Sequence, residues 1–256
     1  MSKILTLYFT KDKSTFNPNN FERIVNQIGV EQEIYIVSRE PINFKEFKNI
    51  VVHTNQDWPV PLRIGYSFNI AIKRIDKNIT EFKYIFKVDD DVILPENYLL
   101  ELVKSKPIVA GIGPALLISI PFYLNILNGK YPINYCDDGY ISALAISKGI
   151  WPELYNGNII IPSVITLKER EYIYGVEYYK WGLHPLLFII LFTTRVYLII
   201  SKKMKLFQKK SFKAFLYNFV GYLHAYLNNY KKYNFHKEYT KMRILHLINS
   251  FFKYYL

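Results

Sequence analysis

The chain has almost no cysteine. Cys136 is its single cysteine among 256 residues, so no disulfide can form within the chain. Small secreted folds held together by disulfide bonds are therefore excluded, and a reducing compartment is favoured. The first residues, 1–3, lead directly into the apolar segment 4–9 and do not resemble a signal peptide. We therefore expect a cytoplasmic protein.

The chain also lacks a clear membrane-spanning segment, which needs roughly 20 apolar residues. The best candidate, 183–200, is strongly apolar but contains His184, Thr193, Thr194 and Arg195. Three interpretations stay open, because such a segment could span a membrane, lie on its surface or pack on the rest of the protein. Disorder is excluded, since 50% of the residues are hydrophobic and 17% are aromatic.

Acidic residues are nearly absent from the C-terminal part of the chain. Residues 1–182 carry 20 basic and 20 acidic side chains, whereas 183–256 carry 13 basic side chains and Glu238 as their one acid. The net charge of +12 therefore belongs to the C-terminal region, which favours an anionic partner such as a membrane or a nucleic acid. Apolar residues recur every three or four positions over 212–227, as in an amphipathic helix that lies on a membrane or packs on a core.

Strand-like and helix-like segments alternate along the first part of the chain. The expected strands are 4–9, 33–37, 50–52, 84–88 and 107–113, with a later one at 141–147, and the expected helices are 20–28, 63–75 and 95–103. This alternation predicts an α/β fold with a mostly parallel sheet that helices cover on both faces. We expect this domain to occupy 1–182 and a basic helical extension to occupy 183–256.

The most informative motif is the triple aspartate Asp89-Asp90-Asp91. It follows the apolar run 84–88 and so lies at the C-terminal end of an expected buried strand, where open α/β sheets bind ligands. Adjacent carboxylates raise one another's pKa unless a cation neutralises them. Their oxygens suit Mg²⁺ or Mn²⁺, and Mg²⁺ usually reaches a protein through one or two carboxylates and substrate phosphates. The alternative interpretation is a solvated acidic turn.

Two motifs together resemble the GT-A glycosyltransferases of family 2, over residues 3–182. The frame Val-Asp-Asp-Asp-Val at 88–92 resembles their DxD motif, and the segment 63–69, Arg-Ile-Gly-Tyr-Ser-Phe-Asn, resembles the helix that precedes it. The resemblance implies a Rossmann-like nucleotide-diphospho-sugar transferase fold, with the catalytic domain at 1–182. It also implies that a sugar moves from a nucleotide-diphosphate sugar to an acceptor hydroxyl, in a metal-assisted displacement that inverts the anomeric carbon.

The resemblance further implies roles for single residues. Asp91 would bind Mn²⁺ or Mg²⁺, and Asp89 would contact the nucleotide sugar and share the metal. The remaining members of the nucleotide site would be Asp90, Arg63 near the diphosphate, Gly65, which permits close approach, Asn69 and Glu40. In the family, the second strand usually ends in an acid that reads the base or the ribose. Either Glu40 takes that role here or the nucleotide is recognised differently.

A general base must accept the proton of the acceptor hydroxyl. Alignment on Gly182 places Glu171 at the position of the family's catalytic acid, one helix earlier. Asp138 is the rival candidate and Glu177 a more distant one. The alternatives without a catalytic role are that Glu177 faces solvent and that 137–139 is an ordinary turn.

The expected partners follow from the charge and from the resemblance. Many enzymes of the family act on lipid-linked acceptors, so the basic extension would hold a peripheral enzyme at the inner face of the membrane, next to a lipid-linked or surface glycan. No nucleic acid is expected, because the charges of 1–182 are balanced. Two alternatives stay open: nucleotidyl transfer, which uses aspartates and two metals, and a non-catalytic protein that binds nucleic acid or membrane through the basic region.

Overall fold

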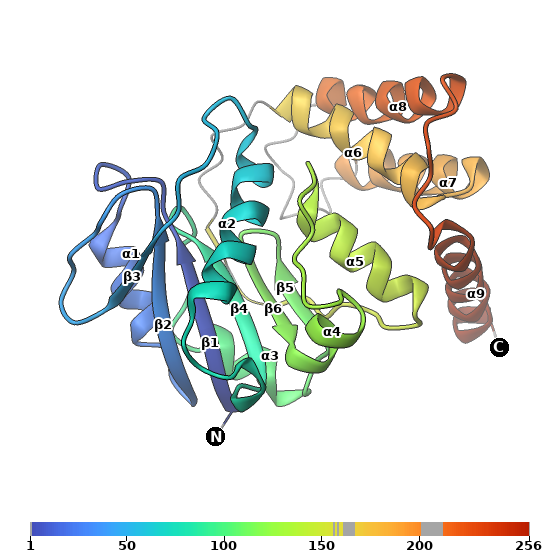
Figure 1. Ribbon diagram of the computed structural model, residues 1–256. Coiled ribbons are helices and arrows are strands. Elements are labelled where there is room, and N and C mark those ends of the chain that lie inside the picture. The colour runs from blue at the N-terminus through green and yellow to red at the C-terminus, as the bar shows by residue number, and fades with distance from the viewer. Residues whose placement is uncertain (1, 156, 158, 161–166, 201–211, 256) are drawn as a thin grey trace. The chain divides into compact units, whose positions relative to one another are not determined.

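The computed structural model describes residues 2–155, 157, 159–160, 167–200 and 212–255 (Figure 1). Its contacts divide the chain into two compact units. The first, called the α/β unit below, comprises Met1–Ser142 and Trp151–Pro162. The second, called the helical unit, comprises Ala143–Ile150 and Ser163–Leu256.

A six-stranded sheet forms the centre of the α/β unit, in the order β3-β2-β1-β4-β6-β5. The strands are β1 (Ser2–Phe9), β2 (Val30–Ser38), β3 (Lys48–Val51), β4 (Tyr84–Asp89), β5 (Val109–Ile112) and β6 (Ala115–Ser119). β1 pairs in parallel with β2 and β4, and β2 pairs in parallel with β3. β6 runs antiparallel to both β4 and β5. The sheet is therefore mixed and mostly parallel, which confirms the α/β prediction.

Helices cover both faces of this sheet (Figure 1). They are α1 (Pro18–Val25), α2 (Val60–Arg74), α3 (Tyr98–Lys104), α4 (Ile120–Asn125) and the short 3₁₀ helix η1 (Ile79–Glu81). On one face, Phe21 of α1 and Leu99 of α3 share a core with Tyr8. On the other face, Phe68 of α2 stacks on Phe9 with ring centroids 6.3 Å apart. The neighbours Tyr8 and Phe9 thus pack on opposite faces of the sheet, because successive side chains of a strand alternate between its faces.

The same alternation in β4 positions the acidic motif. Phe86 and Val88 belong to the core that includes α1 and α3. Lys87 and Asp89 are two residues apart, and their charged groups meet at 2.9 Å. Both therefore point to the other face of the sheet, and Asp89 ends the strand there.

Residues 141–147 lie in a helix, so the predicted strand was wrong. They belong to α5 (Asp137–Ser147), whose first turn contains Asp137 and Asp138. Acidic side chains are favourable at a helix N-terminus, and the two alanines at 143 and 145 favour helix. A short apolar run cannot by itself distinguish a buried helix from a buried strand.

The helical unit contains α6 (Leu167–Trp181), α7 (Pro185–Ile200), α8 (Phe212–Leu227) and α9 (His236–Tyr255). α6 and α8 are in close backbone contact, since a Cβ atom on Gly175 would lie 2.0 Å from the Asn218 carbonyl oxygen and one on Gly221 would lie 2.1 Å from that of Tyr172. This packing places α6 with the later helices, although the sequence analysis put the domain boundary after Gly182. Among the described residues, none of the helices combines the length and the hydropathy needed to cross a membrane.

Candidate functional site

A cavity of about 210 Å³ opens at the C-terminal ends of the four parallel strands. Its lining comes from β1, β2, β4, the segment after β3, and the first turns of α2. The residues are Phe9, Thr10, Lys11, Val37, Ser38, Arg39, Val52, Thr54, Val60, Arg63, Ile64, Ser67, Asp89, Asp90 and Asp91. Three carboxylates and three cationic side chains therefore share one cavity, at the edge of the sheet where α/β proteins bind ligands.

Lys87 is the counter-charge of Asp89. It is 3% exposed in the middle of β4, and its Nζ lies 2.9 Å from Asp89 Oδ1 and 3.0 Å from Oδ2. Nζ also donates a hydrogen bond to the Gly113 carbonyl oxygen at 3.0 Å. Burial alone would lower the pKa of Lys87, but Asp89 and then Asp137 hold that pKa above its usual value.

Burial also raises the pKa of the aspartates. The pKa of Asp89 is raised to about 7 by burial, and Lys87 limits that increase. Burial raises the pKa of Asp90 to about 6, with a smaller contribution from the Asp91 carboxylate, and it raises the pKa of Asp91 as well. The three carboxylates therefore lie in a site that favours a bound cation.

Asp90 contacts α1 through its backbone. Its backbone carbonyl accepts a hydrogen bond from Asn20 Nδ2 at 2.9 Å. Its carboxylate and that of Asp91 raise the pKa of the buried Tyr8, although desolvation is the larger cause. Within the described residues, Asp90 Oδ2 and the Tyr8 hydroxyl are both buried without a hydrogen-bond partner. The three aspartates are therefore not equivalent.

The carboxylates fit a divalent ion only if a ligand completes its coordination. In the part of the chain that the structure describes, no group of three or more His, Cys, Asp and Glu side chains is arranged to hold a metal. Lys87 is in contact with both oxygens of Asp89, whereas Asp91 is partly exposed at the cavity and forms no such ion pair with any described residue. Mg²⁺ characteristically binds through one or two carboxylates plus substrate phosphates, so the donor set suits an ion that arrives with a diphosphate.

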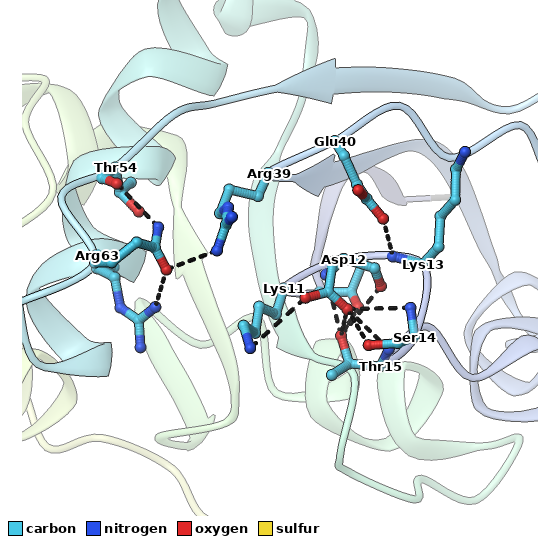
Figure 2. A network of polar contacts seen from close by, with 11 residues as sticks. Lys11, Asp12, Lys13, Ser14, Thr15, Arg39, Glu40, Thr54 and Arg63 are labelled. Carbon is cyan, nitrogen blue, oxygen red and sulfur yellow. Dashed lines mark hydrogen bonds and ion pairs between the residues drawn. The ribbon is translucent and has the colours of Figure 1, made fainter.

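Two arginines line the cavity, one predicted from the sequence and one not. Arg63 lies in the first turn of α2, and Arg39 is the residue after β2. Figure 2 shows their guanidinium groups turned toward one another, beside Thr54. Arginine forks match phosphate geometry better than lysine does, so this wall of the cavity is suited to an anion.

Glu40, predicted for the nucleotide site, is not among the residues that line the cavity. Its Oε1 accepts a hydrogen bond from the Lys13 backbone N–H at 2.8 Å, and Figure 2 shows the side chain turned that way. The structure thus presents Arg39, not Glu40, at the end of β2.

Gly65 and Asn69 hold α2 against the segment that leads to α5. A Cβ atom on Gly65 would lie 2.4 Å from the Pro132 carbonyl oxygen. Asn69 Nδ2 donates to the Tyr131 carbonyl oxygen at 2.8 Å, and Asn69 Oδ1 accepts from the Tyr131 N–H at 2.8 Å. The absence of a side chain at Gly65 therefore allows the backbone at Pro132, and not a ligand, to approach α2 closely.

Asp138 lies in the α/β unit, close to Gly113 and near the Lys87–Asp89 pair. A Cβ atom on Gly113 would lie 2.4 Å from Asp138 Oδ2, and the Gly113 carbonyl oxygen is an acceptor for Lys87. Its neighbour Asp137 is buried and accepts a hydrogen bond from the Tyr131 hydroxyl at 2.7 Å. Burial raises the pKa of Asp137, and Lys87 opposes that increase. Residues 137–139 thus begin helix α5 and are not an ordinary turn, and the two aspartates of this first helical turn belong to one charged network with Lys87 and Asp89.

Glu171 and Glu177 lie in α6, within the helical unit. Glu171 is 1% exposed, and its Oε2 accepts a hydrogen bond from Asn218 of α8 at 3.4 Å. Glu177 is 3% exposed and is paired with Lys180 at 2.6 Å, so it does not face solvent. Asp138 thus belongs to the same unit as Asp89, Asp90 and Asp91, whereas Glu171 lies in a buried contact between two helices of the other unit.

The sequence interpretation did not select Lys11, Arg39 or Lys87. Lys11 and Arg39 each follow a parallel strand by one or two residues, which is the position that brings a side chain to the ligand-binding edge. Lys87 is a charged residue inside an apolar strand, two positions before Asp89 and so on the same face. These two positional signals would have identified all three.

No protein-family model matches the chain, and no curated protein sequence matches it. Solved structures do match. The chain is similar to the mannosyltransferase PcManGT from Pyrobaculum calidifontis, in complex with GDP-Man and Mn²⁺, with a TM-score of 0.54 and 11% identity over 94% of this chain and 84% of that one. It is also similar to TarS 1–349 from S. aureus, with a TM-score of 0.47 and 13% identity over 68% of this chain and 64% of that one. With its mixed, mostly parallel six-stranded sheet flanked by helices, the chain has the fold of the GT-A glycosyltransferases, as its motifs predicted.

Proposed function

We propose that the protein is a glycosyltransferase that moves a sugar from a nucleotide-diphosphate sugar to an acceptor hydroxyl. The observation that carries this proposal is the cavity at the strand ends, where three aspartates and three cationic side chains meet. A donor of this class carries two phosphates, which need positive charge, and a divalent ion bound to them needs carboxylates. PcManGT, which has the same fold, was solved with GDP-Man and Mn²⁺, a donor and an ion of this kind.

Asp91 is our first choice as the metal ligand, with Asp89 as the second. Asp91 is supported by its partial exposure at the cavity, while Asp89 already has a counter-charge in Lys87. When bound, Mn²⁺ or Mg²⁺ would stabilise the charge that develops on the leaving diphosphate. Arg63 would add a fixed positive charge on the same phosphates, and Asp89 would position the sugar nucleotide.

The base that activates the acceptor is a choice between Asp138 and Glu171. Asp138 is supported by its place beside Gly113 and Lys87, in the unit that carries the donor cavity. Glu171 is supported by alignment with the family, and Asn218 would orient its carboxylate. Because Glu171 is 1% exposed, α6 and α8 would have to separate before it met an acceptor. We therefore favour Asp138, acting in a single displacement that inverts the anomeric carbon.

We further propose that the acceptor is lipid-linked or part of a surface glycan, and that the helical unit holds the enzyme on an anionic membrane surface. Its support is a set of exposed apolar side chains in that unit. On α7 and α8 these are Leu186, Ile189, Ile190, Leu216, Val220, Leu223, Tyr226 and Leu227. The region 183–256 also carries the whole net charge of the chain. Helices of this composition bind anionic lipid surfaces.

The test of the main proposal is release of nucleoside diphosphate from a panel of sugar nucleotides, with Mn²⁺, with Mg²⁺ and with EDTA. We expect one donor to be cleaved with metal and not with EDTA, and Asp91→Ala to lower the rate by about 100-fold or more, in line with the loss of one group that stabilises the transition state. Asp76→Ala, a change in an exposed aspartate outside the cavity, should leave the rate within about threefold.

Two results would contradict the proposal. One is the absence of diphosphate release from every donor, and the other is release that Asp91→Ala leaves unchanged. Cleavage between the phosphates, which yields a nucleoside monophosphate, would indicate nucleotidyl transfer instead. Asp138→Asn and Glu171→Gln then separate the two bases, because the true base loses turnover while the donor affinity remains.

A further inference from the structure

Arg39 and Arg63 share one hydrogen-bond acceptor behind the cavity. Arg39 Nη1 donates to Gln56 Oε1 at 2.7 Å, and Arg63 Nη1 donates to the same oxygen at 3.3 Å. Gln56 Nε2 in turn donates to the Thr54 carbonyl oxygen at 3.0 Å, which fixes the orientation of the amide. Figure 2 shows the two arginines meeting at this point. The side chain of Gln56 thus links the segment after β3, which contains it, to the segment after β2 and to the start of α2.

The arginines have no negative partner at this point. Gln56 is neutral, and neither guanidinium forms an ion pair with a carboxylate among the described residues. Arg63 Nε is buried and has no acceptor in the described structure. Two like charges that converge on one neutral oxygen repel each other, and a buried N–H without an acceptor is unfavourable. A bound anion would reduce the repulsion between the two arginines and would give the buried N–H an acceptor.

Both arginines line the cavity, whereas Gln56 does not. A ligand in the cavity therefore meets the guanidinium groups and not the amide that holds them. The third cationic residue of the lining, Lys11, already lies 3.6 Å from Asp12 Oδ2. The uncompensated positive charge of the cavity thus belongs to the arginine pair, and a guanidinium fork offers two parallel donors to phosphate oxygens.

We propose that Arg39 and Arg63, aligned by Gln56, form a diphosphate subsite that binds without a metal ion. The inference rests on the proposed function, since it assigns the diphosphate of the donor to this wall of the cavity. Arg39 and Arg63 contact the ligand, and Gln56 is a positioning residue. The glutamine keeps the two cations together and leaves their charge available to the ligand.

Gln56→Glu is the decisive variant, because it keeps the shape of the side chain and adds one negative charge. The new carboxylate would pair with both arginines, so the melting temperature should stay the same or rise. The same pairing would neutralise the subsite, so affinity for inorganic pyrophosphate should fall about tenfold or more, which corresponds to the loss of one charge-assisted hydrogen bond. A role in folding alone does not predict these opposite changes.

The measurement is calorimetric titration of the full chain with inorganic pyrophosphate and with nucleoside diphosphates, all in EDTA. We expect the unmodified protein to bind, and Arg39→Ala, Arg63→Ala and Gln56→Glu each to weaken binding. Asn55→Asp is the matched control, because it adds the same charge to the same loop at an exposed residue outside the cavity. That variant should change the affinity by less than about threefold.

The inference is overturned if the unmodified protein binds pyrophosphate only with Mn²⁺, if Gln56→Glu binds as well as the unmodified protein, or if Asn55→Asp weakens binding as much as Gln56→Glu. The experiments can contradict this inference and the proposed function independently of each other. Pyrophosphate binding in EDTA without sugar transfer from any donor would support the subsite and contradict the glycosyltransferase. Sugar transfer with no binding in EDTA would do the reverse.

Discussion

At the scale of single residues, Lys87 occupies the least expected place in the α/β unit. A charged lysine that is 3% exposed inside a central strand would be unfavourable without a counter-charge. Asp89 supplies it, because both of its carboxylate oxygens contact the Lys87 ammonium group. Asp89 depends on the lysine in the same way, because burial alone drives its pKa upward. The pair thus sets the charge of the acidic cluster before any ligand is bound.

Removal of Lys87 alone should therefore be costly. We expect Lys87→Met to lower the free energy of unfolding by about 3 to 5 kcal/mol, because it leaves the Asp89 carboxylate buried without a partner. The double variant Lys87→Met with Asp89→Asn should recover most of that loss. Urea denaturation of the four proteins of this cycle measures the coupling. Additive effects of the two substitutions would contradict the pairing.

Metal affinity should increase with pH. Burial raises the pKa of Asp89 to about 7 and that of Asp90 to about 6, so both carboxylates gain protons as the pH falls through this range. A metal binds the deprotonated form, so Mn²⁺ should bind more tightly at pH 8 than at pH 5.5. Titration of the Mn²⁺ electron paramagnetic resonance signal at several pH values measures this. Equal affinity across the range would show that these protons do not compete with the metal.

At the scale of secondary-structure elements, α6 and α8 pack through glycines. A Cβ atom on Gly175 would meet the Asn218 backbone at 2.0 Å, and one on Gly221 would meet that of Tyr172 at 2.1 Å. Both helices of this pair contribute to the buried contact of Glu171 with Asn218. The glycines therefore determine how closely the two helices approach.

Alanine at either glycine should force the helices apart. We expect Gly175→Ala and Gly221→Ala each to reduce the free energy of unfolding by about 1 to 3 kcal/mol, which is typical of overpacking, even though alanine favours helix. Leu227→Ala, at a residue of α8 that is 77% exposed, should cost less than about 0.5 kcal/mol. Thermal melts followed by circular dichroism compare the three. A stabilised glycine variant would contradict the observed packing.

The sequence predicted the parallel strands well, because each is a short apolar run that ends at a turn signal. It failed at 141–147, where an apolar run of the same length belongs to α5. It also placed the domain boundary after Gly182, since charge and composition change there. The contact of α6 with α8 joins residues that are far apart in the sequence, and the periodicity of a single helix does not reveal such a contact. For the cavity, it selected Arg63 and the three aspartates from motifs. It missed Arg39, although that residue directly follows a parallel strand, because no motif marks it and its contact with Gln56 joins segments that are far apart in the sequence.

At the scale of the whole molecule, charge and exposed apolar surface are unevenly distributed along the chain. Residues 1–182 are balanced in charge, and the excess lies in 183–256. Exposed apolar side chains are numerous on α7, α8 and α9. This distribution separates a unit that carries the cavity from one whose exposed apolar side chains and positive charge support the proposed membrane contact.

The full chain should therefore sediment with vesicles that contain anionic lipid. We expect binding to weaken as salt rises from 0.05 to about 0.5 M, because screening reduces the electrostatic part. Leu186→Glu combined with Ile190→Glu should weaken binding further. Ile28→Glu, at an exposed residue of the α/β unit, is the control and should have little effect. Equal partition of all variants, or no binding to any vesicle, would contradict the membrane proposal.

The contact between Gly65 and Pro132 has a consequence for kinetics. Arg63 lies two residues before Gly65, and Asp137 follows Pro132 by five residues, so α2 connects the wall of the cavity that contains Arg63 to the first turn of α5. A donor that draws Arg63 inward should move that turn as well, and the acceptor site should be complete only afterwards. Substrates should then bind in a fixed order, donor first. Initial-rate measurements test this, since the nucleoside diphosphate product should compete with the donor and not with the acceptor.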